Sequence, residues 1–227
     1  MNIFVDIETI PSQQAGALDD IARDIQAPAQ LSKPETIAEW HNGEGKYAGV
    51  KVAAADEAYR KTALDGGSGE IISIAFGSSL DDVVVVYRSQ IENEERLLAT
   101  AFKRIAELAQ NHGSDVRPYF IGHNVGWDLK FLWQRAVVRG VCPPFSLPFG
   151  GRHKSEFYDT MQAWAGFGQR ISQDNLCKVL GIAGKPSDIS GSNVWDFVKR
   201  GDVARVAEYN MHDVETVIKI YNRINFR

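Results

Sequence analysis

Short apolar runs with β-branched residues are spaced along the chain between longer stretches that repeat with helical periodicity. The runs 2–8, 70–77, 82–88 and 117–124 each predict a strand. The turn-rich segment 78–82 joins the second run to the third, which predicts an antiparallel pair. The first run is short, apolar and rich in β-branched residues, so we place it near the middle of a sheet.

Helical spacing of apolar residues dominates the rest of the chain. It predicts helices over 93–113, 128–140, 174–180, 194–199 and 203–225. Asp202 is placed to cap the last of them. Strands come first and helices dominate the end, which predicts an α/β fold with a mixed sheet covered by helices on both faces.

Residues 12–69 differ in kind from the segments around them. They contain helical patches over 37–41 and 52–64, separated and ended by glycines. A chain of 227 residues is long enough for one large core and short for two. We therefore expect one domain over 1–227, with an insertion at about 12–69.

Composition excludes several classes of protein. Lys and Arg number 25 against 29 Asp and Glu, so the formal charge is −4 and the chain lacks the basic field of a non-specific nucleic-acid binder. Two divalent cations would bring this charge to zero. The two cysteines are far apart and lack metal-ligand spacing, so a thiolate zinc site is unsupported. The first strand begins beside Met1 and no apolar run reaches membrane-spanning length, so we expect a cytoplasmic protein that makes no membrane contact.

Two acids interrupt the first apolar run. Asp6 and Glu8 lie two residues apart on a predicted strand, so their side chains point to the same face. Two carboxylates about 5 Å apart repel by roughly 3 kcal/mol at an effective dielectric near 20. This pattern predicts that a cation binds between them.

Two further pairs of polar residues stand at positions where chemistry is expected. Asn124 and Asp128 flank a predicted strand end, so Asp128 can reach toward the acids of the first strand while Asn124 holds the loop. The alternative for Asp128 is a helix N-cap. Tyr209 and Asp213 are four residues apart on the last helix and share one face. The alternative for this pair is an ordinary amphipathic surface.

In this order, the segments FVDIET, GHNVGWD and YNMHD resemble the three motifs of the DEDD superfamily of 3'-5' exonucleases. Tyr209 stands four residues before Asp213, and this spacing resembles the third motif of the tyrosine (DEDDy) branch. Nearly the whole chain resembles the predicted exonucleases related to the proofreading domain of family B DNA polymerases, although 12–69 aligns only loosely and Trp127 stands where that family often has Phe. The resemblance implies a ribonuclease H-like fold with a mixed, mostly parallel central sheet.

The resemblance also implies a two-metal-ion site. Its ligands would be four carboxylates, and oxygen-only ligands suit two Mg²⁺ or Mn²⁺ ions better than zinc. Tyr209 would complete the catalytic set by orienting the attacking water. The residues assigned as metal ligands are Asp6, Glu8, Asp128 and Asp213, and those assigned to substrate are Thr9, Ile10 and Asn124.

The function that follows is removal of nucleoside monophosphates from the 3' ends of single-stranded or frayed DNA. Proofreading or DNA repair would be the setting, with DNA replication or repair proteins as partners. One alternative is a 3'-5' exoribonuclease, because nothing in the motifs reads the 2'-hydroxyl. A second is an inactive nucleic-acid-binding adaptor, in which one or more of the four acids would be expected to be missing.

Three weaker candidates have two interpretations each. A basic stretch with interleaved phenylalanines fits a groove for single-stranded backbone and bases, or else a solvated face over core aromatics. Its members are Arg135, Arg139, Arg152, His153, Lys154, Phe145, Phe149 and Phe157. His123 could touch substrate or be a hydrogen-bonded structural histidine. Asp159 could lie near the metals or cap the helix that follows it.

Overall fold

The computed structural model describes residues 1–88, 93–111, 113, 117–149, 156–184 and 188–227. These residues form two compact units. The larger consists of Met1–Thr9 with Ile71–Arg227, and the smaller consists of Ile10–Glu70. The expected single domain with an insertion at about 12–69 stays a prediction.

A five-stranded sheet forms the centre of the larger unit, in the order β3-β2-β1-β4-β5. Its strands are β1 (Asn2–Ile10), β2 (Glu70–Gly77), β3 (Val84–Tyr87), β4 (Tyr119–Gly122) and β5 (Phe157–Asp159). β1 pairs in parallel with β4, and β4 with β5, whereas β2 and β3 are antiparallel. The predicted central place of β1 and the predicted antiparallel pair are confirmed.

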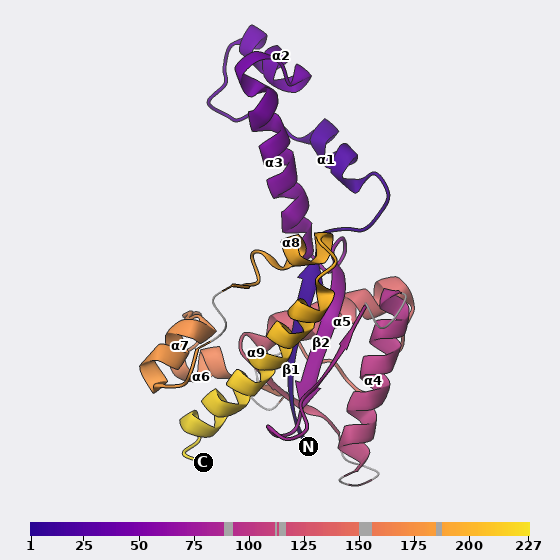
Figure 1. Ribbon diagram of the computed structural model, residues 1–227, viewed down its shortest axis with the longest axis vertical. Helices are drawn as coiled ribbons and strands as arrows, with labels where there is room; N and C mark the ends of the chain where they lie inside the picture. Colours follow the sequence, from indigo (N-terminus) through magenta and orange to yellow (C-terminus); the bar gives the residue numbers. More distant parts are fainter. Residues whose placement is uncertain (89–92, 112, 114–116, 150–155, 185–187) are drawn as a thin grey trace. The chain divides into compact units, whose positions relative to one another are not determined.

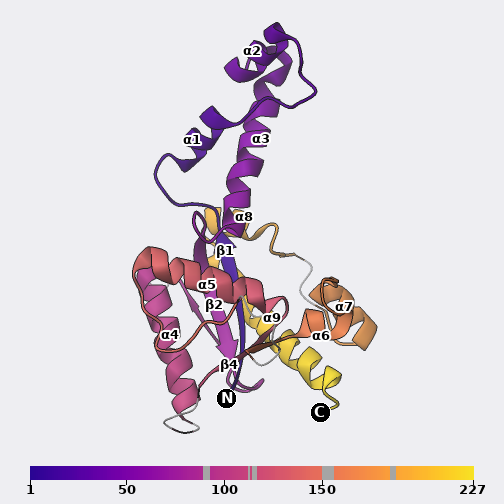
Figure 2. The same cartoon turned by 180° about the vertical axis from the view of Figure 1, so that it is seen from behind.

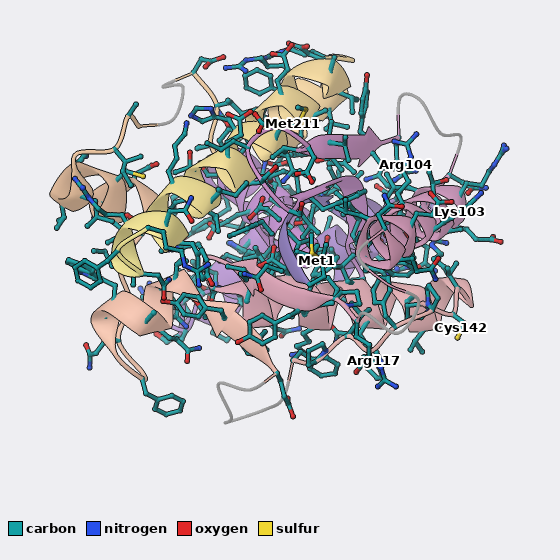
Figure 3. The ribbon with its side chains drawn as sticks, turned by 90° about the horizontal axis from the view of Figure 1, so that it is seen from below. Met1, Lys103, Arg104, Arg117, Cys142 and Met211 are labelled. Atoms are coloured by element: carbon teal, nitrogen blue, oxygen red, sulfur yellow. The ribbon has the colours of Figure 1, made fainter. Side chains whose placement is uncertain are left out.

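Helices cover both faces of this sheet. α9 (Val203–Ile224) crosses in front of the strands in Figure 1, and α4 (Glu94–Gln110) and α5 (Val125–Arg139) lie on the opposite face in Figure 2. The end-on view of Figure 3 shows Met1 between these two helical layers. Three short helices pack against α9, namely α6 (Thr160–Ala165), α7 (Gln173–Leu180) and α8 (Val194–Lys199). The predicted α/β architecture is confirmed.

β1 divides its side chains between the two helical layers, because alternate residues of a strand point to opposite faces. Its odd-numbered apolar residues join the core formed with α4 and α5, and these are Ile3, Val5 and Ile7. Phe4 instead packs with Val214 and Tyr221 of α9. Asp6 and Glu8 follow Phe4 at intervals of two, so they face the same layer.

The smaller unit contains α1 (Ala17–Asp24), α2 (Pro34–Asn42), α3 (Ala48–Lys61) and the 3₁₀ turns Gly45–Tyr47 and Thr62–Leu64. Ser12 links its two ends, since its N–H donates to Thr62 Oγ1 at 2.9 Å and its carbonyl accepts from the Tyr59 hydroxyl. A Cβ at Gly69 would lie 2.5 Å from the Thr62 carbonyl oxygen, so only glycine fits there. α1 was not predicted, and it buries none of its residues.

Among the element boundaries that differ from those predicted, two lie beside candidate site residues. β1 continues to Ile10 rather than ending at residue 8, and α5 begins at Val125 rather than at 128. α5 starts early because Asn124 adopts a left-handed conformation (φ 63°) that turns the chain directly from β4 into the helix. By length and hydropathy, none of the described helices could span a lipid bilayer.

A buried ion network joins β2, α4 and α5. The Glu94 carboxylate is 1% exposed and accepts hydrogen bonds from Arg135 Nε (2.9 Å) and Nη2 (2.6 Å), Arg139 Nε (2.7 Å) and the Ile71 N–H (2.7 Å). Burial alone would raise the pKa of Glu94, but these hydrogen bonds outweigh it and hold the pKa below its usual range.

The groove interpretation is therefore wrong for Arg135, whose buried guanidinium pairs with Glu94, and so is the alternative of a solvated face. Arg139 also pairs with Glu94 but is exposed, so both interpretations stay predictions for it. The three interleaved phenylalanines pack against the main core, as the alternative interpretation expected. The other basic members of the stretch, Arg152, His153 and Lys154, lie outside the described residues.

The ion network predicts a pH-dependent effect of Glu94→Gln. The variant leaves Arg135 charged and buried, so we expect the free energy of unfolding at pH 7 to fall by about 3–5 kcal/mol. The lowered folded-state pKa of Glu94 means that its stabilisation is present above the unfolded pKa of about 4.3 and is lost as the pH falls through the folded value. Urea unfolding of both proteins as a function of pH should show the difference narrowing toward acid.

Glu107→Gln is the control, because Glu107 lies on the same helix and pairs only at the surface, 3.7 Å from Lys103. It should change stability little. Equal effects of the two substitutions at pH 7 would mean that the buried network is not the cause.

Candidate active site

Three carboxylates converge between the sheet and α9. Asp6 and Glu8 reach this space from β1, and Asp213 from the middle of α9. One oxygen from each lies within 4.8 Å of the others. Glu8 and Asp213 are buried and Asp6 is half-buried, so their charges are poorly screened by solvent.

A fourth carboxylate approaches the same strand from the opposite helical layer. Asp128 is 5% exposed, and its Oδ1 accepts the Ile7 N–H at 3.3 Å. Burial, and next the charge of Asp6, raise the pKa of Asp128 well above its usual range. The predicted reach of Asp128 toward β1 is confirmed. Its alternative as an N-cap is wrong, because Asn124 occupies the cap position and Asp128 lies in the first turn of α5.

Tyr209 lies one helical turn before Asp213 on α9. It is only 5% exposed and Asp213 is also buried, so the pair is not an amphipathic surface. Burial raises the pKa of the Tyr209 hydroxyl, and so do the nearby charges of Asp213, Glu8 and Asp6. A hydrogen bond with Asp213 acts in the same direction. The hydroxyl therefore stays protonated at neutral pH.

The three residues predicted to contact substrate lie in different environments. Thr9 is half-buried and follows Glu8 on β1, and Asn124 is exposed at the start of α5. Ile10 is buried and belongs to the smaller unit. Their roles in substrate binding stay predictions.

Asp159 and His123 have structural roles next to the four acids. Asp159 caps α6, and its Oδ1 accepts from the N–H groups of Met161 (2.9 Å) and Asn124 (2.9 Å). The N-cap interpretation is confirmed. His123 also fits the structural interpretation, since its Nδ1 lies 3.0 Å from Thr160 Oγ1 and its Nε2 lies 2.8 Å from the Ile171 carbonyl oxygen.

Sequence patterns missed three polar residues, of which two contact the acidic residues and the third contacts one of these two. Asn210 Nδ2 donates to Asp6 Oδ2 at 2.6 Å, and its Oδ1 accepts from Ser73 Oγ at 3.0 Å. Gln173 Nε2 donates to the Asp213 carbonyl oxygen at 3.1 Å. Two weak signals were available: Ser73 interrupts an apolar strand, and Asn210 lies three residues before Asp213 on a helix.

The donor set fits a hard divalent cation. Every candidate ligand is a carboxylate, and Mg²⁺ and Mn²⁺ prefer oxygen ligands. The mutual repulsion of clustered carboxylates in a poorly screened space would also be relieved by a positive ion. The cluster defined by Asp6, Glu8 and Asp213 therefore has the chemistry of a metal site.

Comparison with protein families supports the same chemistry from a different part of the chain. Residues 70–226 match the family described as predicted 3'-5' exonucleases related to the exonuclease domain of PolB. The chain belongs to this family. The PolB-related exonuclease match includes Asp128, Tyr209 and Asp213, whereas Asp6 and Glu8 precede it. Comparison with curated proteins finds none that matches the chain.

Membership of the PolB-related exonuclease family supports a nuclease, and hence a nucleic acid as substrate. The five-stranded mixed sheet with helices on both faces agrees with a ribonuclease H-like exonuclease fold. The space between β1 and α9 is where residues inside the family match meet Asp6 and Glu8 outside it.

The raised pKa of Asp128 predicts that Asp128→Asn stabilises the protein in EDTA. Asparagine keeps an oxygen to accept the Ile7 N–H and removes a charge that burial and Asp6 disfavour. We expect a gain at pH 7 of at most roughly 3 kcal/mol, the repulsion of two charges about 5 Å apart at an effective dielectric near 20. A raised folded-state pKa makes the wild-type penalty disappear as the pH falls through it, so the gain should shrink toward acid.

Thermal unfolding in EDTA from pH 8 to pH 4 measures this gain. Asp188→Asn is the control, because Asp188 is exposed and its carboxylate pairs with Arg205 at 2.7 Å, which lowers its pKa. That substitution should not stabilise the protein. A less stable Asp128→Asn variant at pH 7 would show that the buried charge carries no penalty.

Proposed function

We propose that the protein is a metal-dependent 3'-5' exonuclease of the tyrosine branch, which releases nucleoside monophosphates from the 3' ends of single-stranded or frayed DNA. The observation that carries the proposal is the convergence of Asp6 and Glu8 on Asp213, with one oxygen of each within 4.8 Å of the others. The family match begins at residue 70, after Asp6 and Glu8. The convergence of the three acids and the family match are thus two independent lines of support for phosphodiester hydrolysis.

Four carboxylates would hold the metal, namely those of Asp6, Glu8, Asp128 and Asp213. Two Mg²⁺ or Mn²⁺ ions bound there would neutralise charge on the phosphate and raise the acidity of the attacking water, as in a two-metal-ion mechanism. The ligands come from β1, α5 and α9, so the packing of both helical layers on the sheet sets their separation. Burial strengthens their attraction for cations by excluding water.

Tyr209 would orient the attacking water rather than deprotonate it. Its hydroxyl has a pKa raised by burial and by three neighbouring carboxylates, so it is a poor base at neutral pH. The same hydroxyl hydrogen-bonds with Asp213, to which a protonated hydroxyl donates, so its oxygen can still accept from a water molecule. Tyr209 would therefore act by orienting the attacking water, and we place it among the catalytic residues.

Substrate contacts would come from Thr9, Ile10 and Asn124. Asn124 is exposed at the N-terminus of α5, a position at which backbone N–H groups favour a phosphate. The proposal includes a cytoplasmic enzyme acting in proofreading or repair, with replication or repair proteins as partners. An exoribonuclease is the second candidate, because carboxylates and metal ions do not distinguish the two polymers. The presence of all four acids argues against an inactive adaptor.

The decisive test is a time course on 5'-labelled single-stranded DNA and RNA of one sequence, with Mg²⁺, Mn²⁺ or EDTA. We expect a ladder that shortens from the 3' end of DNA with either metal and no shortening in EDTA. Asp6→Ala should abolish cleavage, because it removes one of the converging metal ligands. Glu107→Ala is the matched control, since it removes an acid from the surface of α4.

Each result has a distinct meaning. Faster shortening of RNA would favour the exoribonuclease. Cleavage by Asp6→Ala at the control's rate would exclude Asp6 from the site. Binding of either polymer with no shortening under any condition would contradict the enzyme and favour the adaptor.

Tyr209→Phe tests the orienting role. The variant removes one hydroxyl and none of the carboxylates, so we expect Mn²⁺ affinity to be retained and the single-turnover cleavage rate to fall roughly 100-fold. Tyr221→Phe is the control, because it also removes the hydroxyl of a buried tyrosine on α9. That hydroxyl accepts a hydrogen bond from Asn2 and does not contact the acids in the described structure. An unchanged rate in Tyr209→Phe would assign Tyr209 to packing.

A further inference from the structure

Two fully buried polar residues face each other where α9 crosses the sheet. Ser73 of β2 and Asn210 of α9 are both 0% exposed. The same layer contains an apolar cluster to which Ala75, Val214 and Val217 belong. A buried polar group without a partner costs about 1–3 kcal/mol, so such a pair is stable only if its hydrogen bonds are made.

The hydrogen bonds run in one direction, toward Asp6. A carboxylate can only accept, so the Asn210 amide nitrogen must face Asp6 Oδ2, at 2.6 Å. The amide oxygen then faces Ser73, whose hydroxyl donates to it at 3.0 Å. The Asp6 carboxylate fixes this amide orientation, because the opposite one would place an oxygen against a carboxylate, and the Ser73 hydroxyl holds the amide oxygen in place.

These two hydrogen bonds connect three elements that carry or support the candidate ligands. Ser73 lies on β2, Asn210 on α9 and Asp6 on β1. Asn210 also lies three residues before Asp213, so both side chains are on neighbouring positions of one helix face. The helix that supplies Asp213 to the site therefore also holds the carboxylate of Asp6.

We propose that Asn210 is a positioning residue that holds the Asp6 carboxylate in the orientation needed to bind a divalent cation, and that Ser73 supports it by holding the Asn210 amide in place. The inference rests on the proposed function and deepens it. A ligand whose orientation is held before binding loses less freedom on taking up the ion. Hydrogen-bond partners of metal ligands act in this way, and their loss typically costs 10–100-fold in affinity or activity, in order of magnitude.

A purely structural role for these hydrogen bonds makes a different prediction. If Asn210 only satisfies buried polar groups, its replacement lowers the free energy of unfolding and leaves metal affinity unchanged. If it positions Asp6, metal affinity falls as well. Mn²⁺ alone is a suitable probe, because its binding can be measured by electron paramagnetic resonance of the free ion without nucleic acid.

The experiment compares Mn²⁺ affinity and thermal unfolding in EDTA for the wild type and three variants of the full chain. Asn210→Leu keeps the branched shape and removes both hydrogen bonds. Ser73→Ala removes only the hydroxyl that holds the amide in place. Thr216→Val is the control, since Thr216 is equally buried on α9 and is not a candidate ligand.

We expect Mn²⁺ affinity to fall by about 10–100-fold in Asn210→Leu. Ser73→Ala should show a smaller loss in the same direction, and Thr216→Val should bind Mn²⁺ as the wild type does. Near-saturating Mn²⁺ should restore part of the lost cleavage rate. A folded Asn210→Leu variant with wild-type Mn²⁺ affinity would overturn the inference.

Two other outcomes separate this inference from the proposed function. If Asn210→Leu does not fold, Ser73→Ala decides, and wild-type affinity in that variant would overturn the positioning role. A wild-type protein that binds Mn²⁺ but releases no nucleotides would refute the exonuclease, while a loss of affinity in Asn210→Leu would still support the positioning role. Absence of Mn²⁺ binding by the wild type would refute both.

Discussion

The alternation of side chains along β1 is the constraint on which the other features of the larger unit depend. One face of the strand is apolar and packs with α4 and α5, whereas the other presents Phe4, Asp6 and Glu8. An interior acidic face requires neighbours that can donate hydrogen bonds or share a cation. α9 meets this requirement, since it carries a donor, Asn210, beside a further acid, Asp213.

Stability and chemistry oppose each other in this space. Burial, and next a neighbouring carboxylate, raise the cost of keeping an acid charged here, as the raised pKa of Asp128 shows. The Ile7 N–H lowers that cost for Asp128 and the Asn210 amide lowers it for Asp6. The buried Glu94 of the same unit shows the opposite shift, because hydrogen-bond donors surround its carboxylate and its pKa is lowered. The site keeps an excess of negative charge that the rest of the core avoids.

Local periodicity predicted those features that depend only on residues close together in the sequence. The spacing of Asp6 and Glu8 and the shared helix face of Tyr209 and Asp213 follow from strand and helix geometry. Partners distant in sequence were not predictable in this way. Ser73 and Asn210 are 137 residues apart, and nothing local indicates that they meet. Neither interpretation offered for Arg135, a basic groove or a solvated face, included its partner Glu94, which lies 41 residues away. α1 was not predicted, although its residues Leu18 and Ile21 are three apart and share one helix face.

The hydrogen bond from the Ile71 N–H to Glu94 has a consequence for how the fold could vary in length. Ile71 is the first residue of the larger unit after the chain returns from Ile10–Glu70, and Glu94 is anchored by two arginines of α5. The register of β2 is thereby set from within the larger unit. The intervening segment is free to diverge or to be exchanged between relatives as a module, provided that its ends still leave β1 and enter β2 at these points.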